Sequence, residues 1–171
     1  MTTSAKSLFS IQGITGLVGL QGYTGLQGYT GLQGSTGTTG LLGVSARTTS
    51  SCTTSSLANN ATDSSKSIEG FKSYSLLKIN VSVAAWVRLY TSDSTRTSDS
   101  GRTQGEDPLS GAGVIAEVIT TGAIQTILMS PAVLGFNDEV SPTTSIPVAI
   151  TNLSGVTQTV TATLTLVKLE G

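Results

Sequence analysis

Histidine is absent from the 171-residue chain, and cysteine occurs only once, at Cys52. The lack of histidine excludes catalytic triads and zinc sites that use an imidazole, and a single cysteine excludes a disulfide within one chain. A Cys52 bridge between two chains stays open. We therefore expect no cofactor, no metal and no enzymatic activity, and look for a mechanical or binding role.

Charged side chains are scarce too, at 11% of residues with a formal net charge of −1. A nucleic-acid-binding surface needs clustered lysine and arginine, and the chain has no basic run. The first residues, MTTSAKSLFSIQG, lack an apolar run long enough for a signal peptide, and no stretch of about 18 apolar residues occurs anywhere. We expect a protein made in the cytoplasm that neither binds nucleic acid nor inserts into a membrane.

Glycine, by contrast, is abundant and in strict register. Every third residue from 13 to 43 is glycine, namely Gly13, Gly16, Gly19, Gly22, Gly25, Gly28, Gly31, Gly34, Gly37, Gly40 and Gly43. A period of three is that of the collagen triple helix, where only glycine fits at the axis. A flexible linker is the alternative, but linkers favour glycine and serine without a strict period. The pattern predicts a collagen-like triple-helical stalk, about 90 Å long, and therefore a homotrimer.

Proline is missing from this repeat. Each residue then loses about 1–2 kcal/mol of backbone entropy on folding, and the fixed φ of proline is not there to reduce that loss. We expect the stalk to depend on trimerisation elsewhere in the chain.

The repeat is flanked by two segments of different composition. Residues 1–12 form a leader whose apolar cluster is a candidate docking element, made of Leu8, Phe9 and Ile11. Residues 44–70 are rich in serine and threonine, which indicates a linker or an extended, partly paired neck.

Residues 71–171 carry the signals of a β-domain. Apolar residues alternate from residue 77 to residue 89, which predicts either one long strand or two strands joined by a bend near Ala84. The segments 113–120, 124–130, 145–152 and 156–170 are rich in Val, Ile and Thr and are separated by turn sequences. A change of phase near Val167 predicts a β-bulge. No helical periodicity appears, so we expect a mainly β head, an antiparallel β-sandwich of jelly-roll-like type. Its expected inward face is Leu77, Ile79, Val81, Val83, Ala85, Val87 and Leu89.

The opposite face of the first predicted strand pair carries the candidate binding residues Trp86, Arg88 and Tyr90. Together with nearby loop acids this face could stack on a sugar ring. Aromatic and arginine side chains are also enriched where subunits meet, and we favour that interpretation.

A polar segment, residues 91–113, adds the candidates Arg96, Asp99 and Arg102. Long loops on a rigid β-scaffold often carry binding sites. The alternative, which we favour, is a solvated loop whose opposite charges pair with one another or across the trimer.

The runs SGAGVIAEVITTGA, SIPVAITNLSG and TVTATLTLVKLE belong to a stretch, residues 74–170, that resembles a small β-domain of tailed-bacteriophage virion proteins. In those proteins the domain is the C-terminal head of collagen-stalked fibre or decoration proteins. The resemblance implies a homotrimer, a structural role in the virion and no catalysis, and it carries no set of functional residues.

On this basis we expect a short tail or baseplate fibre. Its leader would dock to another virion protein, and its head would attach to a host-surface polysaccharide. A capsid decoration or cement protein that stabilises the head shell is the alternative. A depolymerase is disfavoured, because the chain has no histidine and no separated acidic residues on its predicted strands.

Overall fold

The structure, a computed structural model, describes Gly19, Gly22, Gly25 and residues 46–171. The expected docking residues Leu8, Phe9 and Ile11 lie outside the described residues, as do the other stalk glycines. Residues 46–171 belong to one compact unit, which we call the head.

Eight strands and one short helix make up the described head. In chain order they are β1 (Arg47–Thr53), β2 (Thr62–Glu69), β3 (Ser73–Val81), β4 (Ala85–Tyr90), α1 (Asp93–Ser98), β5 (Val114–Ile119), β6 (Gln125–Phe136), β7 (Ser145–Asn152) and β8 (Thr161–Glu170).

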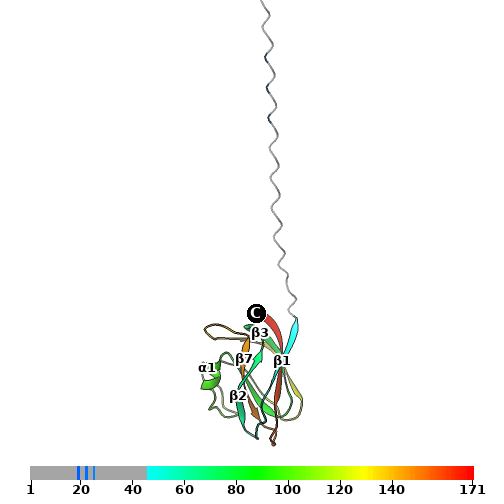
Figure 1. The fold of residues 1–171 in the computed structure, drawn as a ribbon, viewed down its shortest axis with the longest axis vertical. Helices are drawn as coiled ribbons and strands as arrows, with labels where there is room; N and C mark the ends of the chain where they lie inside the picture. The colour runs from blue at the N-terminus through cyan, green and yellow to red at the C-terminus, as the bar shows by residue number, and fades with distance from the viewer. Residues whose placement is uncertain (1–18, 20–21, 23–24, 26–45) are drawn as a thin grey trace, which may run out of the picture. The chain divides into compact units, whose positions relative to one another are not determined.

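The strands form two antiparallel sheets, shown in Figure 1. The first sheet has the order β1-β8-β3-β6 and the second the order β2-β7-β4-β5. Successive strands alternate between the sheets, except that β4 and β5 are neighbours in the second. Eight strands in this order have the topology of a jelly roll. The expected mainly β architecture of antiparallel sheets is confirmed.

The core lies between the two sheets and receives alternate side chains from both. Ile79 and Val81 come from β3, Val87 and Leu89 from β4, and β8 adds Leu164, all with no exposed surface. Full burial of one such side chain stabilises the fold by about 1.5–3 kcal/mol. This alternation of buried and exposed side chains explains why the Val-, Ile- and Thr-rich segments could be predicted as strands from the sequence.

Two strands, not one, occupy the alternating stretch from residue 73 to residue 90. β3 ends at Val81, and β4 begins at Ala85 in the other sheet, so the expected bend near Ala84 is the crossing between sheets. The expected inward position of Leu77 is wrong. The pairing register shifts between Leu76 and Lys78, so that Leu76 is buried instead. One extra residue at a bulge reverses the faces of all positions before it.

The expected neck, residues 44–70, instead contributes two full strands to the head. β1 pairs with β8 along its whole length, from Arg47 opposite Val167 to Thr53 opposite Thr161, and β2 pairs with β7. The head therefore begins at β1, not at residue 71. Serine and threonine gave little apolar alternation from which to predict β1, because backbone hydrogen bonds to β8 define this strand more than apolar side chains do.

Two further expectations shift by a few residues. β6 continues past Ser130 through a cis Ser130–Pro131 bond to Phe136. Proline is tolerated there because β6 lies at the edge of its sheet. The bulge expected near Val167 lies at Leu169, where the register of β8 against β3 shifts.

The close packing of β6 against β3 depends on Gly135, which lies opposite Tyr74. A Cβ atom on this residue would lie 2.7 Å from the Tyr74 hydroxyl oxygen and closer still to the ring. We expect Gly135→Ala to lower the free energy of unfolding by about 1–3 kcal/mol, as overpacking does. Denaturant unfolding followed by Trp86 fluorescence measures this.

Gly101→Ala is the matched control, because nothing lies within 4 Å of a Cβ atom there. It should change the stability by no more than about 0.5 kcal/mol. Equal effects of the two substitutions on stability would show that the contact with Tyr74 does not limit the size of the side chain at residue 135.

Candidate functional site

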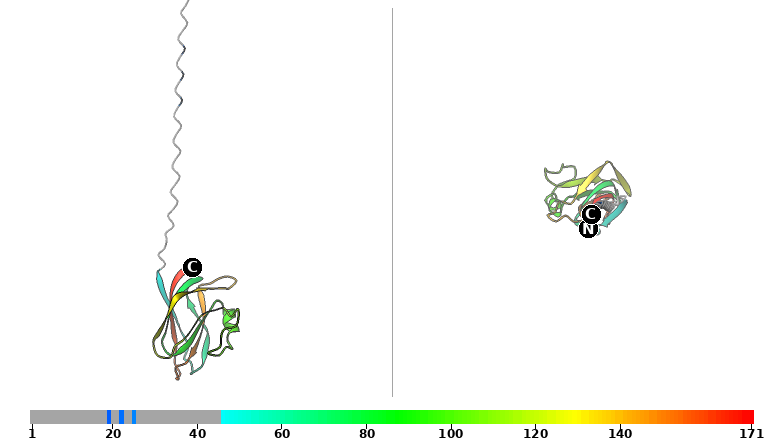
Figure 2. Two further views of the ribbon diagram at one scale, coloured as in Figure 1. Left: turned by 180° about the vertical axis from the view of Figure 1, so that it is seen from behind. Right: turned by 90° about the horizontal axis from the view of Figure 1, so that it is seen from above.

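The segment 91–113, which joins β4 to β5, folds back onto the outer face of the second sheet. Its base is closed by a hydrogen bond of 2.9 Å from the Thr91 amide to the Gly113 carbonyl oxygen. Gly113 has φ +62°, and a Cβ atom there would collide with Thr91 and Thr95, so glycine is required for the closure. Figure 2 shows α1, part of this segment, on the side of the sandwich opposite β1. We call residues 91–113 the covering loop.

The covering loop contains a helix that we did not expect from the sequence. Ser92 caps α1: its side chain accepts a hydrogen bond from the Thr95 amide at 3.1 Å, and the Thr95 hydroxyl accepts one from the Ser92 amide. With only six residues and no buried side chain, α1 has no hydrophobic periodicity. The capping box Ser92-x-x-Thr95 was the available signal.

Arg96, one of the candidate residues, fastens this helix to the neighbouring strand. Its guanidinium group donates a 2.6 Å hydrogen bond to the Lys66 carbonyl oxygen of β2, and it pairs with Asp93 at 2.9 Å. Arg96 therefore lies apart from the other candidates and holds the loop at its start.

The candidates Trp86, Arg88 and Tyr90 do share one face of β4, as expected, but that face is not a surface. Their exposed fractions are 3%, 2% and 1% in a single chain, because the covering loop lies over them. The expectation that they form a subunit interface or stack on a sugar is therefore wrong. A distant segment of the same chain occupies the place that we had assigned to a partner, and the strand pattern alone does not show which segment covers a face.

Asp99 is the residue of the covering loop that binds this face. One carboxylate oxygen accepts a hydrogen bond of 2.6 Å from the Tyr90 hydroxyl and lies 3.4 Å from an Arg88 nitrogen. The other accepts a hydrogen bond of 2.8 Å from Arg102 Nε. Arg88 also stacks on Trp86, with 3.8 Å from its guanidinium carbon to the ring centroid.

Glu117 of β5 completes the cluster, and sequence reasoning missed it. It accepts hydrogen bonds of 2.7 Å from Arg102 and of 2.9 Å from the Trp86 indole nitrogen. The signal was a single carboxylate inside the apolar strand VIAEVI, at the position that pairs with Arg88. The two arginines and two carboxylates are equal in number and oppositely charged, so the cluster is neutral. We call Trp86, Arg88, Tyr90, Asp99, Arg102 and Glu117 the buried charge cluster.

The charge states of this cluster follow from its contacts. Burial alone would raise the pKa of Asp99, but hydrogen bonds from Arg102 and Tyr90, together with the two positive charges, hold it below its usual value. Burial, and then the hydrogen bond to Asp99, raise the pKa of Tyr90. At neutral pH, Asp99 is therefore an ionised acceptor and Tyr90 a neutral donor, which suits a structural lock.

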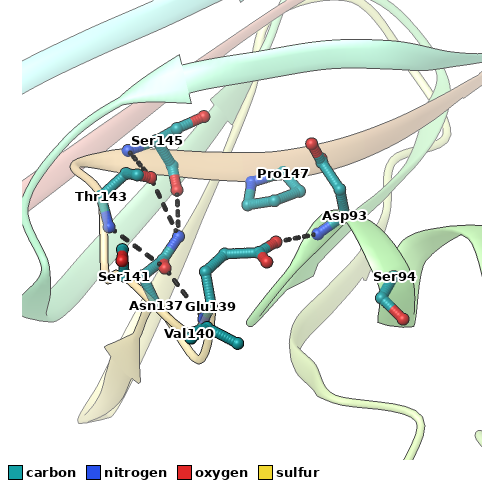
Figure 3. A pocket seen from close by; sticks show the side chains of 9 residues that line it. All are labelled: Asp93, Ser94, Asn137, Glu139, Val140, Ser141, Thr143, Ser145 and Pro147. Carbon is teal, nitrogen blue, oxygen red and sulfur yellow. Dashed lines mark hydrogen bonds between the residues drawn. The ribbon is translucent and has the colours of Figure 1, made fainter.

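Beside α1 lies a polar pocket of about 500 Å³, drawn in Figure 3. The Asn137 side chain donates to the Ser145 carbonyl oxygen at 3.0 Å and accepts from the amides of Glu139 and Thr143. Glu139 accepts a 2.9 Å hydrogen bond from the Asp93 amide, so it satisfies the first turn of α1. The pocket wall is thus held by hydrogen bonds among its own residues.

A second hollow, of about 540 Å³, lies at the outer end of the covering loop and is lined by Asp99, Arg102, Glu106 and Leu109, among others. Glu106 accepts a hydrogen bond of 2.8 Å from the Thr103 amide, and its carbonyl oxygen accepts one from Arg102. Glu106 is therefore engaged in a turn of the covering loop.

The described residues hold no group of three or more potential metal-ligating side chains, and no described helix is long and apolar enough to cross a membrane. The buried charge cluster fixes a long polar loop on a β-scaffold.

Cys52 lies on the inward side of β1 and packs against the core. Burial, and then the nearby negative charge of Asp63, raise the pKa of its thiol to about 11. An inward thiol with so little thiolate is poorly placed to bridge to another chain.

No protein-family model, curated protein or solved structure matches the chain when its sequence and fold are compared with them. The function must therefore be argued from the residues themselves.

Within the buried charge cluster, Asp99 holds the covering loop in place on β4. We expect Asp99→Ala to destabilise the head by about 3–5 kcal/mol, because two arginines would stay buried with a partner removed. Urea unfolding and limited proteolysis of the covering loop measure the effect. Asp107→Ala is the control, an exposed acid in the same loop, and should change stability by no more than about 0.5 kcal/mol. Similar losses in both variants would contradict the role of the cluster.

The raised pKa of Cys52 predicts that its thiol is alkylated slowly in the folded protein. At pH 8 only about one thiol in a thousand would be ionised, so alkylation by iodoacetamide should run about a hundredfold slower in the folded protein than in denaturant. Mass spectrometry of the time course measures both rates. Equal rates, or a chain-to-chain disulfide on a non-reducing gel, would contradict the inward placement.

Proposed function

We propose that this protein is a short homotrimeric fibre of a bacteriophage virion, in which a collagen-like stalk carries a trimer of jelly-roll heads. The observation that carries the proposal is the unbroken glycine register from Gly13 to Gly43, followed after three residues by the first strand of the head. A repeat of period three serves a triple helix, and a rigid head directly after it supplies a means of holding three chains together.

The jelly-roll topology is compatible with this role but does not decide it. Viral capsid and lectin domains use the same architecture, and a fold alone does not imply a function. A structural role is supported by the glycine register, and by a buried charge cluster whose ionisable groups are engaged with one another.

In the proposed fibre, the leader with Leu8, Phe9 and Ile11 docks to another virion protein, and the head attaches to a host-surface polysaccharide. Since Trp86, Arg88 and Tyr90 are covered, a sugar would have to bind a different part of the head. Glycan-array binding by the full chain tests this part. Imaging labelled protein on the particle separates a tail or baseplate fibre from capsid decoration.

The stalk is tested by Gly28→Val, which puts a bulky side chain at the axis of the proposed triple helix. We expect a lower melting temperature of the collagen-type circular dichroism signal, while sedimentation still shows a trimer through the head. Thr30→Val is the matched control, because it adds the same side chain outside the glycine register. Identical melting of Gly28→Val and wild type, or a monomeric wild-type chain, would overturn the proposal.

A further inference from the structure

On the outer face of the first sheet, the edge strand β6 exposes three large apolar side chains. Leu128, Leu134 and Phe136 of the edge strand β6 are 71%, 70% and 52% exposed. All three belong to β6, a strand that contains no charged residue. Such a cluster on an otherwise soluble domain indicates a contact surface.

The pairing register places Leu134 in one row with the start of β1. Arg47 lies opposite Val167, Val167 opposite Ser75, and Ser75 opposite Leu134, so these four residues cross the sheet side by side. Phe136 lies in the next row, opposite Ser73. Three inter-strand spacings separate β1 from β6, about 14 Å.

The remainder of the same face is mostly hydroxyl-bearing and carries three charged residues: Arg47, Lys78 opposite Leu128, and Glu170 opposite Ser73. Threonine and serine alternate outward along β1 and β8, and Thr53 hydrogen-bonds Thr161 across the two strands at 2.9 Å. Hydroxyl groups and apolar side chains with few charges can be buried against another protein at small desolvation cost, whereas a solvated surface normally carries many lysines and glutamates.

The length of the connection argues that the occupant is a second copy of this chain. Gly43, the last glycine of the repeat, precedes Arg47 by four residues, a span of at most about 14 Å. Three chains wound together at Gly43 must therefore bring three copies of Arg47 close to one axis. The surface that they share has to lie within reach of this corner of the first sheet.

The outer face of the second sheet is a poorer choice for this contact. The covering loop lies over it, with Asp99 bound between Arg88 and Arg102. To expose that face, a partner would have to break the buried charge cluster, at a cost of several kcal/mol.

We propose that the outer face of the first sheet, centred on Val167, Leu134 and Phe136 at the end where β1 begins, is the surface through which three heads associate. This inference rests on the proposed homotrimeric fibre and names the contact that holds it together. The heads meet beside the end of the glycine repeat, which fixes the relative register of the three chains before the proline-free stalk winds.

The test is the double variant Leu134→Asp/Phe136→Asp in the full chain. Both side chains are exposed in the monomer, so the head should stay folded, as near-ultraviolet circular dichroism of Trp86 checks. We expect loss of the trimer in sedimentation velocity at a concentration where the wild type is fully trimeric, and loss of stalk refolding after heating. Leu109→Asp/Val140→Asp is the matched control, because these two residues are also exposed but lie outside the first sheet. It should leave both properties unchanged.

The outcomes separate this inference from the fibre proposal. A monomeric wild type would overturn both. A trimeric wild type whose double variant stays trimeric and refolds its stalk would overturn the interface alone.

Hydroxyl-radical footprinting of the wild type gives a measurement that depends on no variant. In the trimer, Leu134 and Phe136 should be oxidised at least several-fold more slowly than Leu109, although all three are exposed in one chain. Equal oxidation in a trimeric sample would mean that this face is left for a partner of different sequence, and would overturn the inference.

Discussion

The ionic contact of Asp99 with Arg88 and Arg102 determines which surfaces the head presents. It holds a loop of more than twenty residues over the second sheet, whose outward face would otherwise expose a tryptophan, a tyrosine and an arginine. A buried pair of this kind adds little net stability compared with an apolar contact, because both partners lose their hydration. Its effect is on specificity. It makes the two sheets unequal, since the covering loop lies over the second sheet, whereas the first exposes apolar side chains of β6.

Much of this architecture could be predicted from the sequence, because burial between two sheets produces alternation. The apolar pattern of β3, β4, β7 and β8 followed directly from it. Three features could not be predicted in that way: β1, which is defined by pairing with β8; the bulge that turns Leu77 away from the core; and the cover over Trp86. Each depends on contacts between segments far apart in the chain, which a local period does not report.

The candidate site shows the same division. Residue types were informative, since Trp86, Arg88, Tyr90, Asp99 and Arg102 do come together in one cluster. The role of these residues could not be predicted from their types, because an aromatic and charged face can bind a sugar, another subunit or a loop of its own chain equally well. Glu117 was the signal that we missed: a lone carboxylate in an apolar strand has to be compensated, and here Arg102 and the Trp86 indole do so.

In the trimeric fibre that we propose, the difference between the two sheets also bears on the order of assembly. Winding a triple helix without proline requires three chains to be aligned at one end, since the entropy lost in nucleation is not offset by a preset φ. A head that folds by itself can supply that alignment only if its association surface lies close to the repeat. In this chain the exposed apolar residues of β6 lie in the rows of the sheet where β1 begins, and β1 follows the last glycine after three residues. Had the same side chains been exposed at the far end of the sheet, near Thr53, association would leave the ends of the three repeats free to separate. For the proposed fibre, the position of the apolar residues along β6, more than their number, thus favours heads that align the three chains first and a proposed stalk that winds afterwards.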